Sequence, residues 1–257
     1  MARLAELVHY TDELLATDST PDYSVALNGL QIENSGELKG IAAAVDFSTR
    51  AIEGAIAAGA NLLVVHHGMF WGGFGPIKDA FYKRLRLLID NDIAVYSSHL
   101  PLDRHPEFGN NVLLAKELGL VPSGSFANYD GIFIGVSGHS DVETDALVDR
   151  ARRFAGQYDT EVRVSRTSRG HQTMRWAMCT GAGASTDTMK EAIKMGVDTL
   201  IVGEGPHWTA IQAEESALTI IYAGHYATET LGVRALAEHL GKKYNVPSSF
   251  VSAPTGL

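Results

Sequence analysis

Apolar and polar positions follow two periods along the chain. From residue 41, short runs of Ala, Val, Ile and Leu are followed by stretches with apolar residues every three or four positions. The runs are typical of buried strands and the stretches of amphipathic helices. In the first half this predicts strands at residues 41–45, 61–67 and 93–99, and helices at 49–59, 79–92 and 110–119. Alternating strands and helices indicate βαβ units, a mainly parallel sheet and the α/β fold class.

The second half repeats the pattern. It predicts strands at residues 131–138, 161–167, 175–181, 199–204 and 218–224, and helices at 143–156, 187–196 and 228–244. Residues 121–131 mix Pro, Gly, Ser and Asn without periodicity, which is typical of a linker. We therefore expect two α/β domains, residues 1–125 and 126–257.

Composition narrows the class of protein. The N-terminal residues 1–18 predict an amphipathic helix in which acidic residues interrupt any signal-peptide core, and no apolar run reaches the roughly 18 to 20 residues of a membrane span. The single cysteine, Cys179, lies in an apolar run and is expected to be an inert core residue. With a net charge of −9 and no basic block, we expect a cytoplasmic protein that binds neither membrane nor nucleic acid.

Histidines gather where predicted strands end. His66 and His67 close one strand, His99 closes the next and precedes Asp103 and His105, and His225 follows the last strand and precedes Glu229. Ligands of parallel sheets collect at the carboxyl ends of the strands. A lone histidine is usually a surface or hydrogen-bonded residue, but three strand ends that each offer a pair of metal-binding residues favour a metal centre.

The adjacent histidines suggest two ions. Successive side chains of a strand point to opposite faces, so His66 and His67 do not easily reach one ion. Two ions about 3.5 to 4 Å apart would accept one histidine each. In the alternative, one histidine binds metal and the other hydrogen-bonds the backbone.

Two further pairs are spaced four residues apart. His225 and Glu229 would share one face of a helix that begins near His225, and Glu229 could bridge two ions. Between His99 and Asp103 stands Pro101, which favours a turn. Asp103 is then the expected ligand, whereas His99 is either a ligand or a residue that orients one.

Other segments allow a functional and a structural interpretation. The Gly-rich loop 181–185 could bind an anion but is more typical of a tight turn. Phe70 and Trp71 could stack on a planar ring or simply pack. Glu204 and His207 could serve in acid–base chemistry or form a polar helix start.

The ligand set predicts the kind of metal. Three neutral imidazoles and the carboxylates of Asp103 and Glu229 leave two divalent ions with excess positive charge. Such a centre attracts hydroxide, phosphate or a polarised carbonyl, and it acidifies bound water. Mixed nitrogen and oxygen ligands without thiolate suit zinc, iron, manganese, cobalt or nickel.

These motifs resemble the GTP cyclohydrolase 1 type 2-like, or NIF-three-like, family of di-metal proteins. The resemblance runs from VALNGLQIE (residues 25–33) through VVHHGMFWGG and SSHLPLDRHPEFGNN to AGHYATETLG. It implies two α/β domains without an inserted third, a toroidal homohexamer, and two metal ions per subunit in the cleft between the domains. The implied ligands are His66, His67, Asp103, His225 and Glu229.

The resemblance also implies hydrolytic opening of the imidazole ring of GTP, although a motif fixes a metal site better than a substrate. We expect a metal-dependent hydrolase for a nucleotide or another small substrate, with His99 or Glu204 as catalytic residues that move protons. The competing hypothesis is a non-catalytic assembly that binds, stores or delivers metal. A third, an adaptor for a protein partner, gains little from the composition.

Overall fold

The computed structural model describes residues 3–166 and 170–256 of the 257-residue chain. The chain forms two compact units, neither continuous in sequence: unit 1 is Met1–Phe108 with Gly232–Ala253, and unit 2 is Gly109–Leu231 with Pro254–Leu257. Each unit contains a β-sheet with helices, which confirms the predicted α/β class.

The unit bounds differ from one division near residue 125. Residues 121–131 are not a linker, because β5 (Gly124–Tyr129) lies there and pairs antiparallel with β6 (Ile132–Glu143). The turn between the two strands is Asp130–Gly131, and both residues have positive φ, 46° and 85°. An Asp-Gly pair with this backbone is a strong hairpin signal. The linker prediction was wrong because the Gly, Ser and Asn residues of this segment are typical of loops and hid the apolar pattern of β5.

The sheet of unit 1 is mainly parallel. Its strand order is β1-β4-β3-β2-β11, in which β1 alone of the described strands runs antiparallel to its neighbour. The bounds are β1 Gly29–Ile32, β2 Ile41–Asp46, β3 Leu62–His67, β4 Ala94–Ser97 and β11 Ser248–Phe250. Since β2, β3 and β4 are parallel, their carboxyl ends share one edge.

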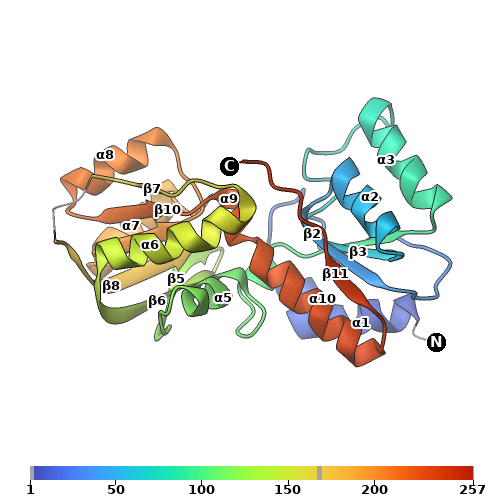
Figure 1. Ribbon diagram of the computed structural model, residues 1–257, viewed down its shortest axis with the longest axis horizontal. Coiled ribbons are helices and arrows are strands. Elements are labelled where there is room, and N and C mark those ends of the chain that lie inside the picture. The colour runs from blue at the N-terminus through green and yellow to red at the C-terminus, as the bar shows by residue number, and fades with distance from the viewer. Residues whose placement is uncertain (1–2, 167–169, 257) are drawn as a thin grey trace. The chain divides into compact units, whose positions relative to one another are not determined.

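Helices cover both faces of this sheet. Figure 1 shows α1 (Leu4–Leu15) and α10 (Thr230–Tyr244) on one side, and α2 (Thr49–Ala57) and α3 (Asp79–Asp90) on the other. The strand residues alternate accordingly. Leu62 and Val64 pack in the core beside α1 and α10, whereas Leu63 and Val65 pack beside α2 and α3. A strand buried on both faces reads as one continuous apolar run, as β3 does.

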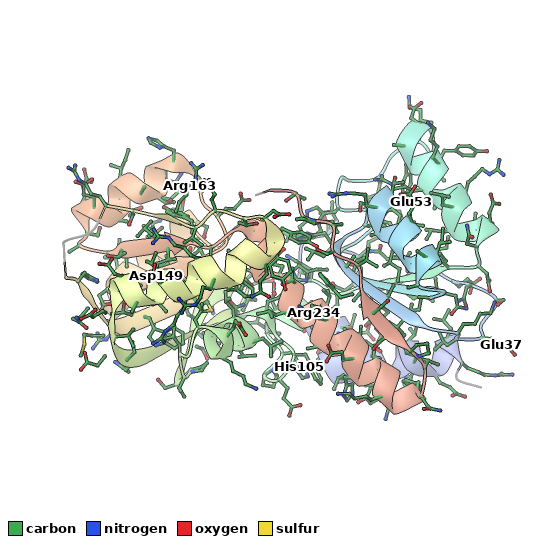
Figure 2. The ribbon with its side chains drawn as sticks, in the orientation of Figure 1. Glu37, Glu53, His105, Asp149, Arg163 and Arg234 are labelled. Carbon is green, nitrogen blue, oxygen red and sulfur yellow. The ribbon has the colours of Figure 1, made fainter. Side chains whose placement is uncertain are left out.

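Local sequence signals define these helices. The Ser48 hydroxyl accepts the backbone N–H of Ala51 at 3.2 Å and so caps α2, while Ile52 is buried and Glu53 is exposed. In Figure 2, Glu53 points away from the sheet. Two short elements complete the unit, η1 Thr17–Ser19 and α4 Leu100–Asp103. No helix within the described ranges is long and apolar enough to cross a membrane.

The sheet of unit 2 is mixed. Its order is β5-β6-β8-β9-β10-β7, and of its pairings only β8–β9 and β9–β10 are parallel. The remaining strands are β7 Arg163–Val164, β8 Gln172–Cys179, β9 Thr199–Val202 and β10 Thr219–Tyr222. The expectation of a mainly parallel sheet was wrong here, because the β5–β6 hairpin and the β6–β8 pair are antiparallel.

The helices of unit 2 are α5 Asn110–Glu117, α6 Thr144–Ala155, η2 Gly156–Tyr158, α7 Thr186–Met195, α8 His207–Glu215 and α9 His225–Thr228. Cys179 lies in its buried apolar core, as expected. Residue 167 of the strand expected at 161–167, and residues 1–2 of the first expected helix, lie outside the described residues.

Candidate metal centre

Unit 1 gathers three histidines at the carboxyl edge of its sheet. His66 and His67 end β3, and His99 follows β4, the neighbouring parallel strand. One possible ligand atom from each lies within 4.8 Å of the others. All three side chains are buried. The structure therefore adds His99 to the histidine pair.

The adjacent histidines converge although their strand positions alternate. His66 continues the face of Leu62 and Val64, and His67 the face of Leu63 and Val65. Their ring centroids are nevertheless 4.9 Å apart, and His99 lies 4.9 Å from His66 and 5.7 Å from His67. Because β3 ends at His67, the alternation no longer keeps the two side chains apart.

The Nδ1 atom of each of these rings lies within hydrogen-bonding distance of an oxygen atom. His66 Nδ1 lies 2.9 Å from the carbonyl oxygen of Ser98. His67 Nδ1 lies 2.9 Å from Asp46 Oδ1, and His99 Nδ1 lies 2.8 Å from Asp22 Oδ1. A neutral imidazole that donates Nδ1–H to an oxygen presents the lone pair of Nε2 to a metal. With Nδ1 occupied in this way, each of the three rings can offer Nε2 to an ion.

A small network fixes the Asp22 carboxylate. Its second oxygen accepts the side-chain N–H of Asn28 at 2.8 Å and the backbone N–H of Leu100 at 2.9 Å. The side-chain oxygen Oδ1 of Asn28 accepts the backbone N–H of His99 at 2.7 Å. Burial opposes the charge, but the hydrogen bonds from His99, Asn28 and Leu100 hold the pKa of Asp22 below its ordinary value. The carboxylate stays ionised and orients His99.

Asp103 joins the cluster, and His105 does not. Asp103 is buried in α4, with Oδ2 3.5 Å from His66 Nε2. His105 Nδ1 accepts the backbone N–H groups of Glu107 and Phe108, each at 3.1 Å. Its ring stacks on Phe108 at 4.7 Å between centroids. His105 therefore stabilises a turn.

Unit 2 brings His225 and Glu229 together. His225 is the first residue of α9 and Glu229 is its C-cap, so the pair spans one helical turn. His225 Nε2 lies 3.1 Å from Glu229 Oε2, and His225 Nδ1 lies 2.8 Å from Glu204 Oε1. Glu204, expected as an acid–base residue, holds the far side of the imidazole, as Asp46 and Asp22 do in unit 1.

The two carboxylates raise the proton affinity of His225. Burial lowers its pKa, but Glu229 and Glu204 outweigh that effect and raise the pKa of His225 to about 9. The raised pKa favours the imidazolium at neutral pH, so an ion that bound Nε2 would displace a proton.

The Gly-rich loop 181–185 is a tight turn that makes room for Glu229. Gly181 has φ 61°, and a Cβ on it would collide with Glu229 Oε1. At the other end, Ser185 accepts the N–H of Thr188 at 3.2 Å and caps α7. The N-terminus of α7 is thus satisfied within the chain, which supports the tight-turn interpretation.

Two supporting residues, Asp46 and Asp22, escaped the sequence analysis, whereas Trp71 had been expected either to stack on a ligand or to pack. Asp46 ends β2 one residue beyond the predicted strand, a position that marks a strand-end candidate. Asp22 lies in a loop whose sequence carries no such signal. Trp71 lies 4.5 Å from His67 and 4.6 Å from His99 between ring centroids, so it packs on the histidines.

The donor set fits a transition metal. Convergent imidazoles with buried carboxylates nearby, and no thiolate, suit first-row metals better than calcium or magnesium. The fold and these side chains define an α/β protein with buried histidine and carboxylate groups that could hold a metal ion.

The chain belongs to the Duf34/NIF3 (NGG1p interacting factor 3) family, whose sequence profile matches residues 2–255. A relative from Deinococcus radiodurans is 38% identical over 98% of this chain and 94% of its own length. A relative from Pyrococcus abyssi is 41% identical over 98% of both chains. Both bear the name GTP cyclohydrolase 1 type 2 homolog.

Solved structures agree with the family assignment. The structure of protein ybgI, titled as of unknown function, is 33% identical, with a TM-score of 0.89 over 99% of this chain and 100% of its own. A protein from Thermus thermophilus is 35% identical, with a TM-score of 0.82 over 99% of this chain and 100% of its own.

Proposed function

We propose that this protein is a dinuclear metal-dependent hydrolase that acts on a nucleotide or another small substrate. His66, His67, Asp103, His225 and Glu229 together would hold two divalent ions of zinc, iron, manganese, cobalt or nickel. One observation carries the proposal: His66, His67, His99 and His225 each have Nδ1 beside an oxygen acceptor. This arrangement is characteristic of metal-ligating histidines. The name shared by the curated relatives adds the nucleotide.

The metal pair would supply Lewis-acid polarisation and acidify water at neutral pH. Asp103 and Glu229 would offset part of its charge. Asp46, Asp22 and Glu204 would orient the imidazoles by accepting their Nδ1–H groups. The place of His99 beside His66 and His67 supports a role in holding metal over a role as proton carrier.

Metal analysis and turnover test the proposal together. Purified full-length protein is expected to hold close to two ions per chain, and Glu229→Gln is expected to lower that number. Hydrolysis of GTP and of a panel of phosphoesters, with added manganese, zinc or iron, is expected to exceed that of a double ligand variant. Bound metal without turnover would instead favour storage or delivery, and absence of metal would contradict both functions.

The proposal includes the assembly that the family resemblance implies. Light scattering of the purified chain is expected to give the mass of a homohexamer. A monomer under the same conditions would contradict that part alone.

A further inference from the structure

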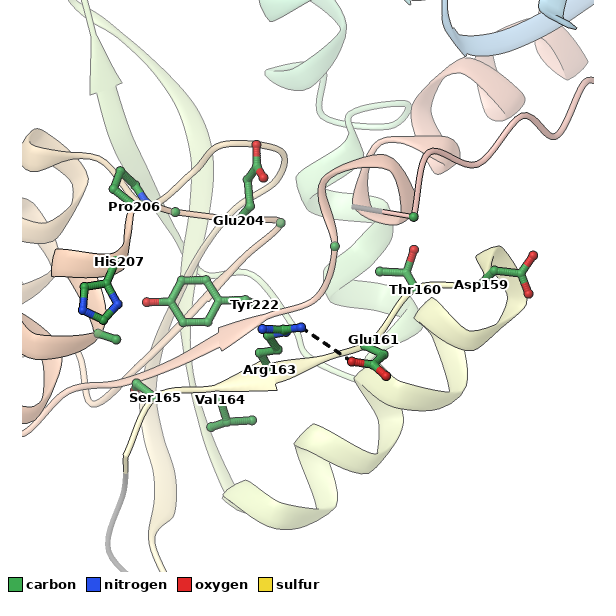
Figure 3. A pocket seen from close by; sticks show the side chains of 15 residues that line it. Asp159, Thr160, Glu161, Arg163, Val164, Ser165, Glu204, Pro206, His207 and Tyr222 are labelled. Carbon is green, nitrogen blue, oxygen red and sulfur yellow. Dashed lines mark ion pairs between the residues drawn. The ribbon is translucent and has the colours of Figure 1, made fainter.

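Unit 2 contains a cavity of about 760 Å³ beside the candidate ligand His225. Residues 159–165 and 203–207 contribute most of its lining, as Figure 3 shows. Small-molecule sites commonly enclose about 300–1,000 Å³, so the volume suits a small organic ligand. Glu204 lines the cavity and also lies 2.8 Å from His225 Nδ1. Glu204 would thus stand between a ligand in this unit 2 cavity and the candidate metal ligand His225.

The lining suits a flat molecule. The ring of Tyr222 faces the cavity, and its hydroxyl lies 2.8 Å from Thr209 Oγ1, which fixes the ring. Four glycines, Gly203, Gly205, Gly224 and Gly256, add no side chains to the lining. At Gly224 the backbone has φ 93°, and a Cβ would collide with Thr160. The backbone can therefore approach Thr160 this closely only at a glycine.

The charge of the lining is negative. Asp159, Glu161 and Glu204 contribute three carboxylates and Arg163 contributes one guanidinium, so the lining residues in the described ranges carry a formal excess of two negative charges with His207 neutral. Glu204 also faces the imidazole of His225 at 2.8 Å, so the excess is one negative charge when that imidazole is protonated. Arg163 is already paired, because its Nη2 lies 3.7 Å from Glu161 Oε2. The cavity thus offers acceptors and an aromatic face, which together attract organic cations and N–H donors.

We propose that the unit 2 cavity binds a flat organic molecule with a cationic amidinium or amino group. The ring would lie against Tyr222 and its N–H groups would meet the carboxylates. That this molecule is the substrate rests on the proposed hydrolase function, whereas the charge preference of the cavity does not. A polyphosphate group would lie outside this cavity.

The N-terminus of α8 would favour an anion in the cavity instead. α8 begins at His207 beside the cavity without a side-chain cap, and a helix N-terminus attracts anions. Its effect is equivalent to about half an elementary charge, which is less than the one negative charge that remains on the lining when Glu204 is paired with a protonated His225. The carboxylates are therefore expected to make the cavity prefer cations over anions.

Three probes of one shape but different charge test this preference. Benzamidine is cationic, benzamide is neutral and benzoate is anionic, and each can be titrated into full-length protein while amide NMR shifts are followed. A chelator-treated sample prevents benzoate from binding metal. We expect benzamidine to bind about tenfold more tightly than benzoate, with shifts around Tyr222. Equal or tighter binding of benzoate would overturn the proposal and favour the helix terminus.

Variants place the probe in the cavity. Glu161→Gln is expected to weaken benzamidine about two- to fivefold, since this carboxylate is largely exposed. Tyr222→Leu is expected to weaken it about three- to thirtyfold, whereas Tyr222→Phe keeps the aromatic face and most of the affinity. Glu117→Gln, on an exposed part of α5 in the same unit, is the matched control and is expected to change nothing. If Glu161→Gln and Tyr222→Leu both leave the affinity unchanged while circular dichroism shows them folded, the probe binds elsewhere.

The two proposals fail in different ways. Selective benzamidine binding in a protein without bound metal or turnover would contradict the hydrolase and leave the cavity assignment intact. Metal-dependent turnover with no preference for benzamidine would contradict the cavity assignment alone.

Discussion

The candidate metal-binding histidines of unit 1 (His66, His67 and His99) and of unit 2 (His225) are held in different ways. In unit 1 three rings, with relative exposures of 0%, 5% and 7%, meet at the ends of two adjacent parallel strands. In unit 2 a single ring, with 27% of its side chain exposed, lies between Glu204 and Glu229 on a four-residue helix. Unit 1 therefore presents three buried imidazoles at the ends of adjacent strands, and unit 2 presents one imidazole between two carboxylates on a short turn.

The difference assigns separate tasks to the two units. Sheet ends hold side chains precisely enough to fix metal ligands, because neighbouring strands lock their positions. The His225–Glu229 pair of unit 2 depends on loop geometry, and a cavity opens beside it. Metal retention is then expected to depend most on unit 1, while proton release and ligand selection depend on unit 2.

Removal of a histidine from unit 1 has the largest expected effect. His67→Ala deletes a buried imidazole of the histidine cluster, so we expect the loss of about one of the two proposed ions per chain. Elemental analysis after gel filtration measures it. His9→Ala, which changes a histidine that is 76% exposed, is the control and should retain the full content. Equal metal content in the two variants would remove His67 from the site.

Gly181→Ala tests the dependence of unit 2 on its loop. The added Cβ would collide with Glu229 Oε1, and alanine is also strained at φ 61°. We expect metal affinity to fall about 100-fold, near the upper end of the effect of lost ligand support. Gly156→Ala is the control, because it has open space around its Cβ position. Similar affinities in a competition assay with a chromogenic chelator would contradict this role.

Asp46→Ala and Glu204→Ala compare the carboxylates that hold a histidine in each unit. Loss of such a partner weakens metal binding about 10- to 100-fold. We expect Asp46→Ala to lie at the high end, since the His67 ring that Asp46 holds is buried. Glu204→Ala is expected at the low end, because Glu229 still lies 3.1 Å from His225. Asp90→Ala, an exposed aspartate on α3, is the control. The reverse order, measured by the same competition assay, would contradict the contrast.

Much of this arrangement could be predicted from the sequence. Strand ends of unit 1 were readable because β2, β3 and β4 are continuous apolar runs buried on both faces, and their last residues are polar. The spacing of His225 and Glu229 matched one helical turn. Family membership is likewise confirmed by the match over residues 2–255.

The remainder depended on contacts between distant segments. Asp22 holds His99 from 77 positions away in the sequence, and no local pattern reveals such a pair. The sequence also does not reveal that α10 packs in unit 1. An amphipathic pattern shows that a helix packs against a core but not which sheet it covers. The β5–β6 hairpin was missed for a local reason, since the Asp130–Gly131 signal was taken as part of a linker.

The mildest perturbation is a change of pH, which is expected to alter metal binding in unit 2 without any substitution. Because the two carboxylates raise the pKa of His225 to about 9, the metal-free imidazole carries a proton throughout the neutral range. An ion that binds Nε2 must displace this proton, so its affinity rises with pH and levels off above about pH 9. Below that pH the expected slope is about tenfold per pH unit, or about 1.36 kcal/mol.

Glu204→Gln separates this proton effect from the loss of an anchor. Glutamine retains an oxygen that can accept the Nδ1–H of His225, but it lacks the charge that favours the imidazolium. The pH at which affinity levels off should therefore move below that of the unchanged protein. Isothermal titration with zinc in buffers of different ionisation enthalpy measures the protons released at each pH. The same proton release and the same plateau in Glu204→Gln and the unchanged protein would mean that Glu204 does not set the protonation of His225, and the contrast between the two units would then rest on geometry alone.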